Sequence, residues 1–164
     1  MKDWIDADTV DMGEFRVVAG TGRLAVRGLG SCVAVVLYDP TTSVGGIAHV
    51  MLPSHTLARG QEKPARFADT AIPLLLSEVM RLEIRRESVT ARLVGGARMF
   101  ETMVLAGTLH MGERNVLACR TAIRETGLVI AGEEVGGHRG RSILFDVSDG
   151  TIAVRVLGGV ERHV

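Results

Sequence analysis

The chain has 164 residues, of which 19 are basic and 19 are acidic, so its formal net charge is zero. This balance does not favour general binding to nucleic acid or to membrane surfaces. Hydrophobic residues make up 46% of the chain and aromatic residues only 4%. We therefore expect a single domain, residues 1–164, with a core of aliphatic side chains and no nucleic-acid partner.

The sequence has no sign of a targeting or membrane segment. No apolar stretch approaches the length of a membrane span, and residues 1–6 do not have a signal-peptide pattern. We expect a cytoplasmic protein without membrane insertion, in which Cys32 and Cys119 form no disulfide framework. The histidines other than His49 are scattered without metal-ligand spacing, so neither a metal nor another cofactor is predicted.

The first half of the chain is rich in predicted strands. Apolar runs predict short strands at residues 14–19 and 24–26, and longer ones at 33–38 and 45–53. Residues 39–43 are turn formers, so the two longer strands are expected to pair as a hairpin. Four strands are therefore expected before the first helix.

The second half combines helices with strands. Apolar positions recur at helical spacing over residues 65–82, where Pro73 indicates a late start or a kink. A second helix is predicted at residues 114–125, with Gly127 as its stop. Further strands are expected at 89–94, 128–131, 142–147 and 151–156, the last two joined at an Asp-Gly turn. We expect an α+β layered sandwich of β-sheets covered by two main helices.

Cys32 and His49 are the candidate catalytic residues. Cys32 opens the first run of the predicted hairpin and His49 lies in the second, so pairing sets thiol and imidazole side by side. A free thiol is mostly protonated at neutral pH, and a neighbouring histidine accepts its proton when the sulfur acts as a nucleophile. On residue type alone, burial of both side chains in a core is the competing interpretation.

Gly30 and Ser31 precede the candidate nucleophile in a short loop. Successive backbone N–H groups in such a loop form a nest that binds the oxyanion of a tetrahedral intermediate. We therefore expect Gly30 and Ser31 to stabilise the oxyanion or to position the substrate. Cys119, in contrast, is expected in the core.

At these residues the chain resembles the CheD family of chemoreceptor glutamine deamidases. The motifs are, in chain order, Leu29-Gly30-Ser31-Cys32-Val33-Ala34-Val35, Ala48-His49-Val50-Met51-Leu52-Pro53, Phe67-Ala68-Asp69-Thr70-Ala71, Gly95-Gly96-Ala97, Gly112 with Arg114-Asn115, and Gly140-Arg141-Ser142. The resemblance implies a CheD-like fold and hydrolysis of selected glutamine side chains of methyl-accepting chemotaxis receptors to glutamate. It also implies that Cys32 is the nucleophile, acting through a thioester, and that His49 is the base.

One position departs from the family pattern. The family commonly has a threonine six residues before the cysteine, whereas this chain has Val26 there. A third group that orients His49 must then be something other than a side-chain hydroxyl, and the backbone carbonyl of Val26 is our candidate. The expected fold also resembles the catalytic domain of the cytotoxic necrotizing factor toxins, in which a main-chain oxygen fills this role.

Two other functions remain open on the sequence. The resemblance also implies binding to a CheC-type phosphatase of the response regulator, so a non-catalytic regulatory binding partner is the alternative function. A cysteine protease or a thiol redox protein would share the cysteine and histidine chemistry, but the chain lacks a Cys-x-x-Cys motif. Replacement of Cys32 by alanine distinguishes deamidation from binding to the CheC-type partner, because binding survives the replacement and deamidation does not.

Overall fold

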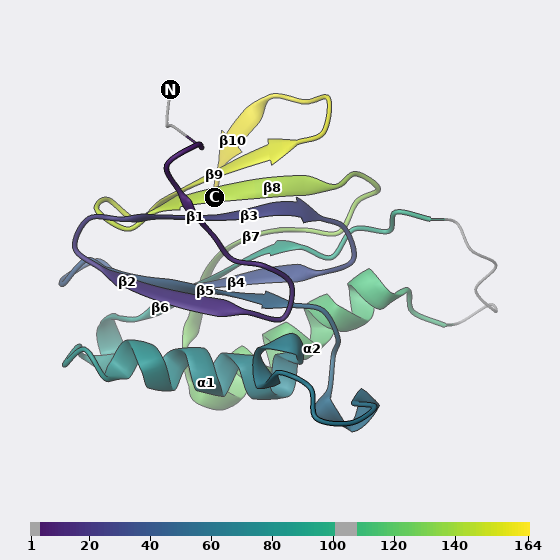
Figure 1. Cartoon of the computed structure of the whole chain (residues 1–164), viewed down its shortest axis with the longest axis horizontal. Helices are drawn as coiled ribbons and strands as arrows, with labels where there is room; N and C mark the ends of the chain where they lie inside the picture. The colour runs from purple at the N-terminus through teal and green to yellow at the C-terminus, as the bar shows by residue number, and fades with distance from the viewer. Residues whose placement is uncertain (1–3, 101–107) are drawn as a thin grey trace.

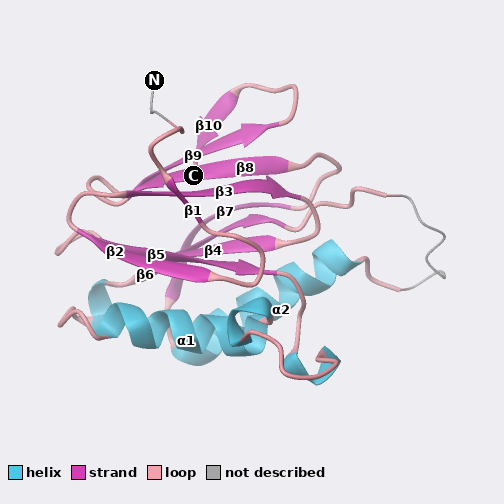
Figure 2. Cartoon of the chain, in the orientation of Figure 1, coloured by secondary structure: helices cyan, strands magenta, loops and turns pink. Residues whose placement is uncertain are grey.

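Two β-sheets lie on each other, and the helices cover the outer face of one of them. The structure is a computed structural model that describes residues 4–100 and 108–164. Figure 1 shows the helices beneath the lower sheet and the second sheet above it, and Figure 2 separates the helical layer from the strands by colour. This arrangement confirms the expected α+β layered sandwich with two main helices.

The bounds of the elements, in chain order within each class, are as follows. The strands are β1 (Asp8–Thr9), β2 (Phe15–Ala19), β3 (Arg23–Leu29), β4 (Val33–Asp39), β5 (Val44–Val50), β6 (Thr90–Gly95), β7 (Val129–Val135), β8 (Arg141–Asp146), β9 (Thr151–Val156) and β10 (Glu161–His163). The helices are α1 (Ala68–Met80) and α2 (Met111–Thr126), with short 3₁₀ helices η1 (His55–Leu57), η2 (Pro64–Arg66) and η3 (Arg86–Ser88). Neither α1 nor α2 is long and apolar enough to span a membrane.

Strand order explains where the core lies. Among the described residues, one sheet has the order β1-β3-β8-β9-β10 and the other the order β2-β5-β4-β6-β7. Helix α1 packs on β5, β2 and β4, and α2 packs on β4, β7 and β6. The sheet centred on β4 is therefore covered on both faces, by helices on one side and by the other sheet on the opposite side.

Strand β4 is buried along its whole length because it lies in the middle of this arrangement. Its alternate residues Val33 and Val35 belong to the core beneath the helices. Ala34 and Val36 belong to the core between the two sheets. This division follows from the two-residue period of side chains along a strand. The same period shows on which face of the sheet the side chains next to β4 lie.

The predicted hairpin and the predicted helices are present, with shifted boundaries. β4 and β5 pair antiparallel, from Asp39 opposite Val44 to Val33 opposite Val50. Helix α1 starts three residues later than predicted because η2 precedes it, and it contains Pro73. Helix α2 starts three residues earlier than predicted and ends at Gly127, whose φ of 78° places it in the left-handed region that glycine favours.

Two strands were not predicted. β1 contains two residues and pairs parallel with β3, and β10 contains three residues and pairs with β9. Segments this short carry too few residues to show an alternating pattern. Five strands, including β1, therefore precede helix α1, instead of the expected four.

Candidate active site

Cys32 lies immediately before β4, at the edge of the core between the two sheets. Its side chain is half-buried and packs against that core. Its carbonyl oxygen accepts a hydrogen bond from the N–H of Gly96 at 2.8 Å. Gly95 has a φ of 121°, and a Cβ there would collide with this carbonyl oxygen, so the close approach of the two backbones requires glycine. The position of Cys32 is thus fixed by β6 as well as by β4.

His49 lies on the neighbouring strand and on the same face of the sheet. It pairs with Ala34, which follows Cys32 by two residues, so Cys32 and His49 are diagonal neighbours across the hairpin instead of directly opposite. Ile47, two residues before His49, packs in the core between the sheets, which places His49 on that face as well. Diagonal neighbours have Cα atoms about 7–8 Å apart, within reach of longer side chains.

The hydrogen bonds of His49 define its tautomer. Its Nδ1 lies 3.2 Å from the carbonyl oxygen of Val10. A carbonyl oxygen can only accept, so Nδ1 carries the hydrogen and Nε2 has the free lone pair. The side chain is only 3% exposed, and Nε2 is buried without a hydrogen-bond partner in the part of the chain that the structure describes. His49 therefore presents an unoccupied basic nitrogen.

The oxygen at His49 Nδ1 belongs to Val10 and not to Val26. Val26 is fully buried in the core between the sheets, where it pairs with Ile143 on β8. Val10 follows the unpredicted strand β1, and its own N–H donates to the carbonyl of Ala25. The main-chain oxygen that contacts His49 Nδ1 is therefore that of Val10 and not that of our candidate Val26, and the pairing of β1 with β3 brings it there.

Burial shifts the pKa of Cys32 and the pKa of His49 in opposite directions. Burial is the main cause that lowers the pKa of His49, and it outweighs the opposing effects of the Val10 carbonyl and of the charge of Asp11. Burial also raises the pKa of the Cys32 thiol, against the opposing charge of Arg66 and the backbone N–H of Cys32. Both shifts favour the uncharged form of each group, a thiol at Cys32 and a neutral imidazole at His49.

Gly30 and Ser31 line a pocket of about 440 Å³ together with Cys32. The carbonyl of Gly30 accepts from the N–H of Ala97, and the carbonyl of Ser31 accepts from the side chain of Asn115. Within residues 4–100 and 108–164, the N–H groups of Gly30 and Ser31 donate no hydrogen bond. They remain available as donors to a group bound beside Cys32.

The rest of this pocket is lined by the segment after β6, which includes Arg98, and by residues at the start of α2. Met99 and Phe100 are 42% and 76% exposed and form one wall, and His110, Met111 and Gly112 form another. An ion pair of 2.8 Å joins Arg98 to Glu113 beside it. His49 lies in a neighbouring pocket of about 460 Å³ with Arg27 and Gly28. Gly28 thus lines the pocket of His49, and the following residues Gly30, Ser31 and Cys32 line the other pocket.

Three residues that contact this site or act on it were given no role in it from the sequence, although Asn115 lies in one of the family motifs. Val10 was missed because the strand before it is too short to recognise. Arg66, on η2, was missed because only the fold brings its charge close to Cys32. Asn115 carried a usable signal, since it is a polar residue on the otherwise apolar face of α2 that includes Val116 and Cys119.

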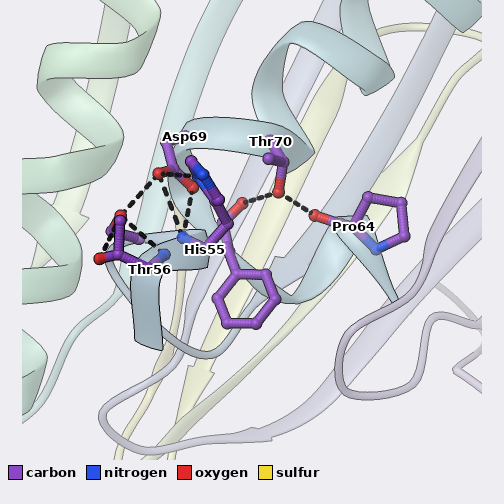
Figure 3. Close-up of polar contacts among 7 residues, drawn as sticks. His55, Thr56, Pro64, Asp69 and Thr70 are labelled. Carbon is purple, nitrogen blue, oxygen red and sulfur yellow. Dashed lines mark hydrogen bonds and ion pairs between the residues drawn. The ribbon is translucent and has the colours of Figure 1, made fainter. Parts of the chain in front are cut away.

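A second group of polar side chains surrounds the start of α1. Asp69 accepts hydrogen bonds from Ser54 Oγ at 2.7 Å and from the N–H of His55, and His55 Nδ1 lies 2.8 Å from it (Figure 3). Thr70 donates to the carbonyl of Pro64 at 2.5 Å. These contacts attach η1 and η2 to the first turn of α1. No cluster of His, Cys, Asp and Glu suited to a metal ion occurs among the described residues.

Comparison with known proteins identifies the family of this chain. The family model described as CheD chemotactic sensory transduction matches residues 51–156. A protein of Desulforamulus reducens named "Probable chemoreceptor glutamine deamidase CheD" is 43% identical over 149 residues, which is 91% of this chain and 90% of that protein.

Two further relatives carry the same name without the word "probable". The protein of Halalkalibacterium halodurans is 38% identical over 160 residues, covering 97% of this chain and 99% of its own length. The protein of Thermotoga maritima is 37% identical over 153 residues, covering 93% and 94%. Matches of this extent, together with the family model, show that the chain belongs to the CheD family.

Proposed function

We propose that this protein is a chemoreceptor glutamine deamidase, a hydrolase that converts selected glutamine side chains of methyl-accepting chemotaxis receptors to glutamate. The names of the full-length relatives support this activity and substrate class. We further propose that the chain is one catalytic domain that acts in the cytoplasm, where the signalling regions of such receptors lie, and that it needs no cofactor.

The observation that carries the proposal is the Nε2 of His49, which has no partner among residues 4–100 and 108–164 and lies on the strand next to that of Cys32. In the first step the Cys32 thiol transfers its proton to Nε2 while the sulfur attacks the side-chain carbonyl carbon of the glutamine. The Val10 carbonyl, which accepts from Nδ1, stabilises the imidazolium that forms. The N–H groups of Gly30 and Ser31 donate to the developing oxyanion.

In the second half of the reaction His49 first acts as an acid and then again as a base. The imidazolium Nε2–H protonates the amide nitrogen, and the carbon–nitrogen bond breaks. Ammonia departs, and the substrate carbonyl stays bound to Cys32 as a thioester. A water molecule then transfers a proton to Nε2 and attacks the thioester carbon. Collapse of this intermediate returns the proton from Nε2 to the sulfur and releases the glutamate side chain. One water is consumed and one ammonia released, and Cys32 and His49 return to their starting forms.

The pocket beside Cys32 suits the substrate side chain. Gly30 lies against Met99, where a Cβ would come within 3.1 Å of the Met99 side chain, so glycine keeps room at this wall. The apolar surface of Met99 and Phe100 contacts the methylene groups of the glutamine, and the polar end meets Cys32. The exposure of Phe100 extends this contact toward the receptor backbone.

The test is peptide mass spectrometry of a chemoreceptor cytoplasmic fragment incubated with the purified protein. Wild-type protein and the Cys119→Ala variant are expected to convert specific glutamines to glutamate, and Cys32→Ala is expected to convert none. Cys119 is fully buried in the core under the helices, which makes it the matched cysteine control. Conversion by folded Cys32→Ala would refute the nucleophile. Conversion of no glutamine on several receptors would refute the activity.

The implied interaction with a CheC-type phosphatase stays a prediction. The same variants test it, because binding to a CheC-type partner does not need the thiol. Retained binding by Cys32→Ala, measured by titration calorimetry, would separate a regulatory role from deamidation in one protein.

A further inference from the structure

Asn115 connects the two strands of the candidate site from the opposite side of the sheet. It lies near the start of α2 and is fully buried. Its Nδ2 donates to the carbonyl oxygen of Ser31 at 2.9 Å and to that of Met51 at 2.9 Å. Ser31 immediately precedes Cys32, and Met51 follows His49 by two residues. One side-chain amide therefore holds the backbones that carry both groups.

The chemistry of the acceptors fixes the orientation of this amide. Both partners are carbonyl oxygens, which cannot donate, so the NH₂ group and not Oδ1 must face them. Oδ1 is buried without a partner among the described residues. An unpartnered buried oxygen destabilises the folded protein, so Asn115 is not the residue that packing alone would select on this helix face.

Asn115 binds the two carbonyl oxygens at the point where the pairing of β4 and β5 ends. The β4–β5 ladder stops at Val33 opposite Val50. Beyond it the chain of β5 turns away, and the N–H groups of Met51 and Leu52 both donate to the carbonyl of Arg66. The backbone carbonyls of Ser31 and Met51 thus lie at a fork with no ladder bond between them. The two hydrogen bonds of Asn115 replace that missing connection.

We propose that Asn115 is a positioning residue that fixes the separation of Cys32 and His49 by clamping the Ser31 and Met51 carbonyls. This inference rests on the proposed roles of Cys32 and His49. Without the clamp, the loop that carries Cys32 keeps its hydrogen bonds to Gly96 and Ala97 but loses the connection through Asn115 to the end of β5. The distance between the thiol and His49 Nε2 then varies more, and proton transfer between them becomes less frequent. The pocket walls formed by Met99 and Phe100 do not depend on it.

The test compares Asn115→Asp and Asn115→Ser with Ile123→Ala, each in the full chain with Cys119→Ala as background. Aspartate keeps the size of the side chain but places a second acceptor against two carbonyls, and serine shortens it without adding a charge. Ile123 is fully buried on the same helix and packs in the core under it, so Ile123→Ala controls for loss of stability. Thermal unfolding selects a temperature at which all variants are folded.

Both Asn115 variants are expected to lower kcat for receptor deamidation at least tenfold and to leave KM within twofold. Ile123→Ala is expected to keep kcat within twofold despite a lower Tm. If folded Asn115→Ser keeps kcat within twofold, or if Ile123→Ala loses as much as Asn115→Ser, the positioning role is overturned.

Alkylation of Cys32 by iodoacetamide separates this inference from the proposed function. The His49→Asn variant gives the alkylation rate of a thiol without its base, and the Asn115 variants are expected to approach that rate. This comparison needs no receptor, so it remains decisive if the wild-type protein deamidates nothing. An alkylation rate unchanged from wild type in the folded Asn115 variants would overturn the clamp, whatever the receptor assay shows.

Discussion

Two histidines in this protein have an oxygen partner at Nδ1, and they differ in almost everything else. His49 is buried, its Nδ1 contacts a main-chain carbonyl, and its Nε2 has no partner among the described residues. The His55 side chain is 63% exposed, and its Nδ1 contacts the carboxylate of Asp69. On residue types alone, His55 with Asp69 and Ser54 looks more like a catalytic triad than the pair of His49 and Cys32 does.

The order of contacts shows why that resemblance is misleading. In a catalytic triad the histidine lies between the carboxylate and the nucleophile. Here the carboxylate lies in the middle, because Ser54 Oγ and His55 Nδ1 both contact Asp69 Oδ2 (Figure 3). The hydroxyl of Ser54 therefore donates to an anion, which does not remove its proton. The cluster fixes η1 to α1, and its polar atoms are used in doing so.

The comparison shows that a catalytic site needs polar atoms whose hydrogen-bonding positions are not already occupied within the protein. At Asp69 the carboxylate is satisfied by Ser54 and by the side chain and backbone of His55. At the other site, the His49 Nε2 and the N–H groups of Gly30 and Ser31 have no hydrogen-bond partner within the described part of the chain. Unused groups of complementary chemistry within one small region are what covalent catalysis requires.

The largest difference is expected from removing each histidine in turn. His49→Asn should lower the rate of receptor deamidation by about 10²–10⁴-fold, since it removes the general base. His55→Asn should keep the rate within about twofold, because the His55 side chain contacts Asp69, which attaches η1 to α1. The rates are measured by mass spectrometry on the same receptor fragment. A large loss at His55 with an intact fold would contradict the comparison.

A second prediction concerns the thiol itself. Because burial raises the pKa of Cys32, its alkylation rate should keep rising with pH beyond about 8.5, the ordinary range of a free thiol. Between pH 7 and pH 9 the rate should rise at least about tenfold, as expected for a neutral thiol. Cys119→Ala should have the same profile, because Cys119 is buried. A plateau that extends to acidic pH would instead show a resting thiolate–imidazolium pair.

The secondary structure could largely be predicted because its signals are local. The turn formers at residues 39–43 and the Asp-Gly turn at Asp149 each join the strands that they were expected to join. Gly127 ends α2 because a left-handed residue is needed there. The diagonal offset of Cys32 and His49 was not predicted, because register depends on the length and shape of the turn as well as on its composition.

The partners of the site could not be predicted because they come from distant segments. The oxygen that contacts His49 lies 39 residues away in the chain, and Asn115 lies 84 residues from Ser31. Nothing in the sequence near His49 indicates that the accepting carbonyl oxygen belongs to Val10 and not to Val26. Only the parallel pairing of β1 with β3 brings Val10 to this position.

A smaller effect is expected from Asp69→Asn. The substitution removes a charge that accepts from Ser54 and His55 in a partly exposed position, so it should lower the free energy of unfolding by about 1–2 kcal/mol. Urea denaturation gives this value. The alkylation rate of Cys32 should remain at the wild-type level. A change in that rate would show that the Asp69 cluster shapes the active site as well as the loop.

The smallest expected difference is in how low pH changes the stability contributed by His49 and by Asp69. Burial lowers the pKa of His49 in the folded protein below its ordinary value of about 6.5, so the unfolded chain binds this proton more readily. The stability associated with neutral His49 is therefore present above about pH 6.5 and is lost as the pH falls below it.

Asp69 contributes in a lower window, because its hydrogen bonds from Ser54 and His55 outweigh burial and hold its pKa below the ordinary value of about 3.9. Its contribution is present above that value and is lost only as the pH falls through the lowered pKa of the folded state. Urea denaturation at pH 7.5 and 5.5 should therefore show a smaller loss of stability in His49→Asn than in wild type. Asp69→Asn should show the wild-type loss over this interval, because its window lies below it. Equal losses in all three proteins would mean that His49 is not held neutral by burial.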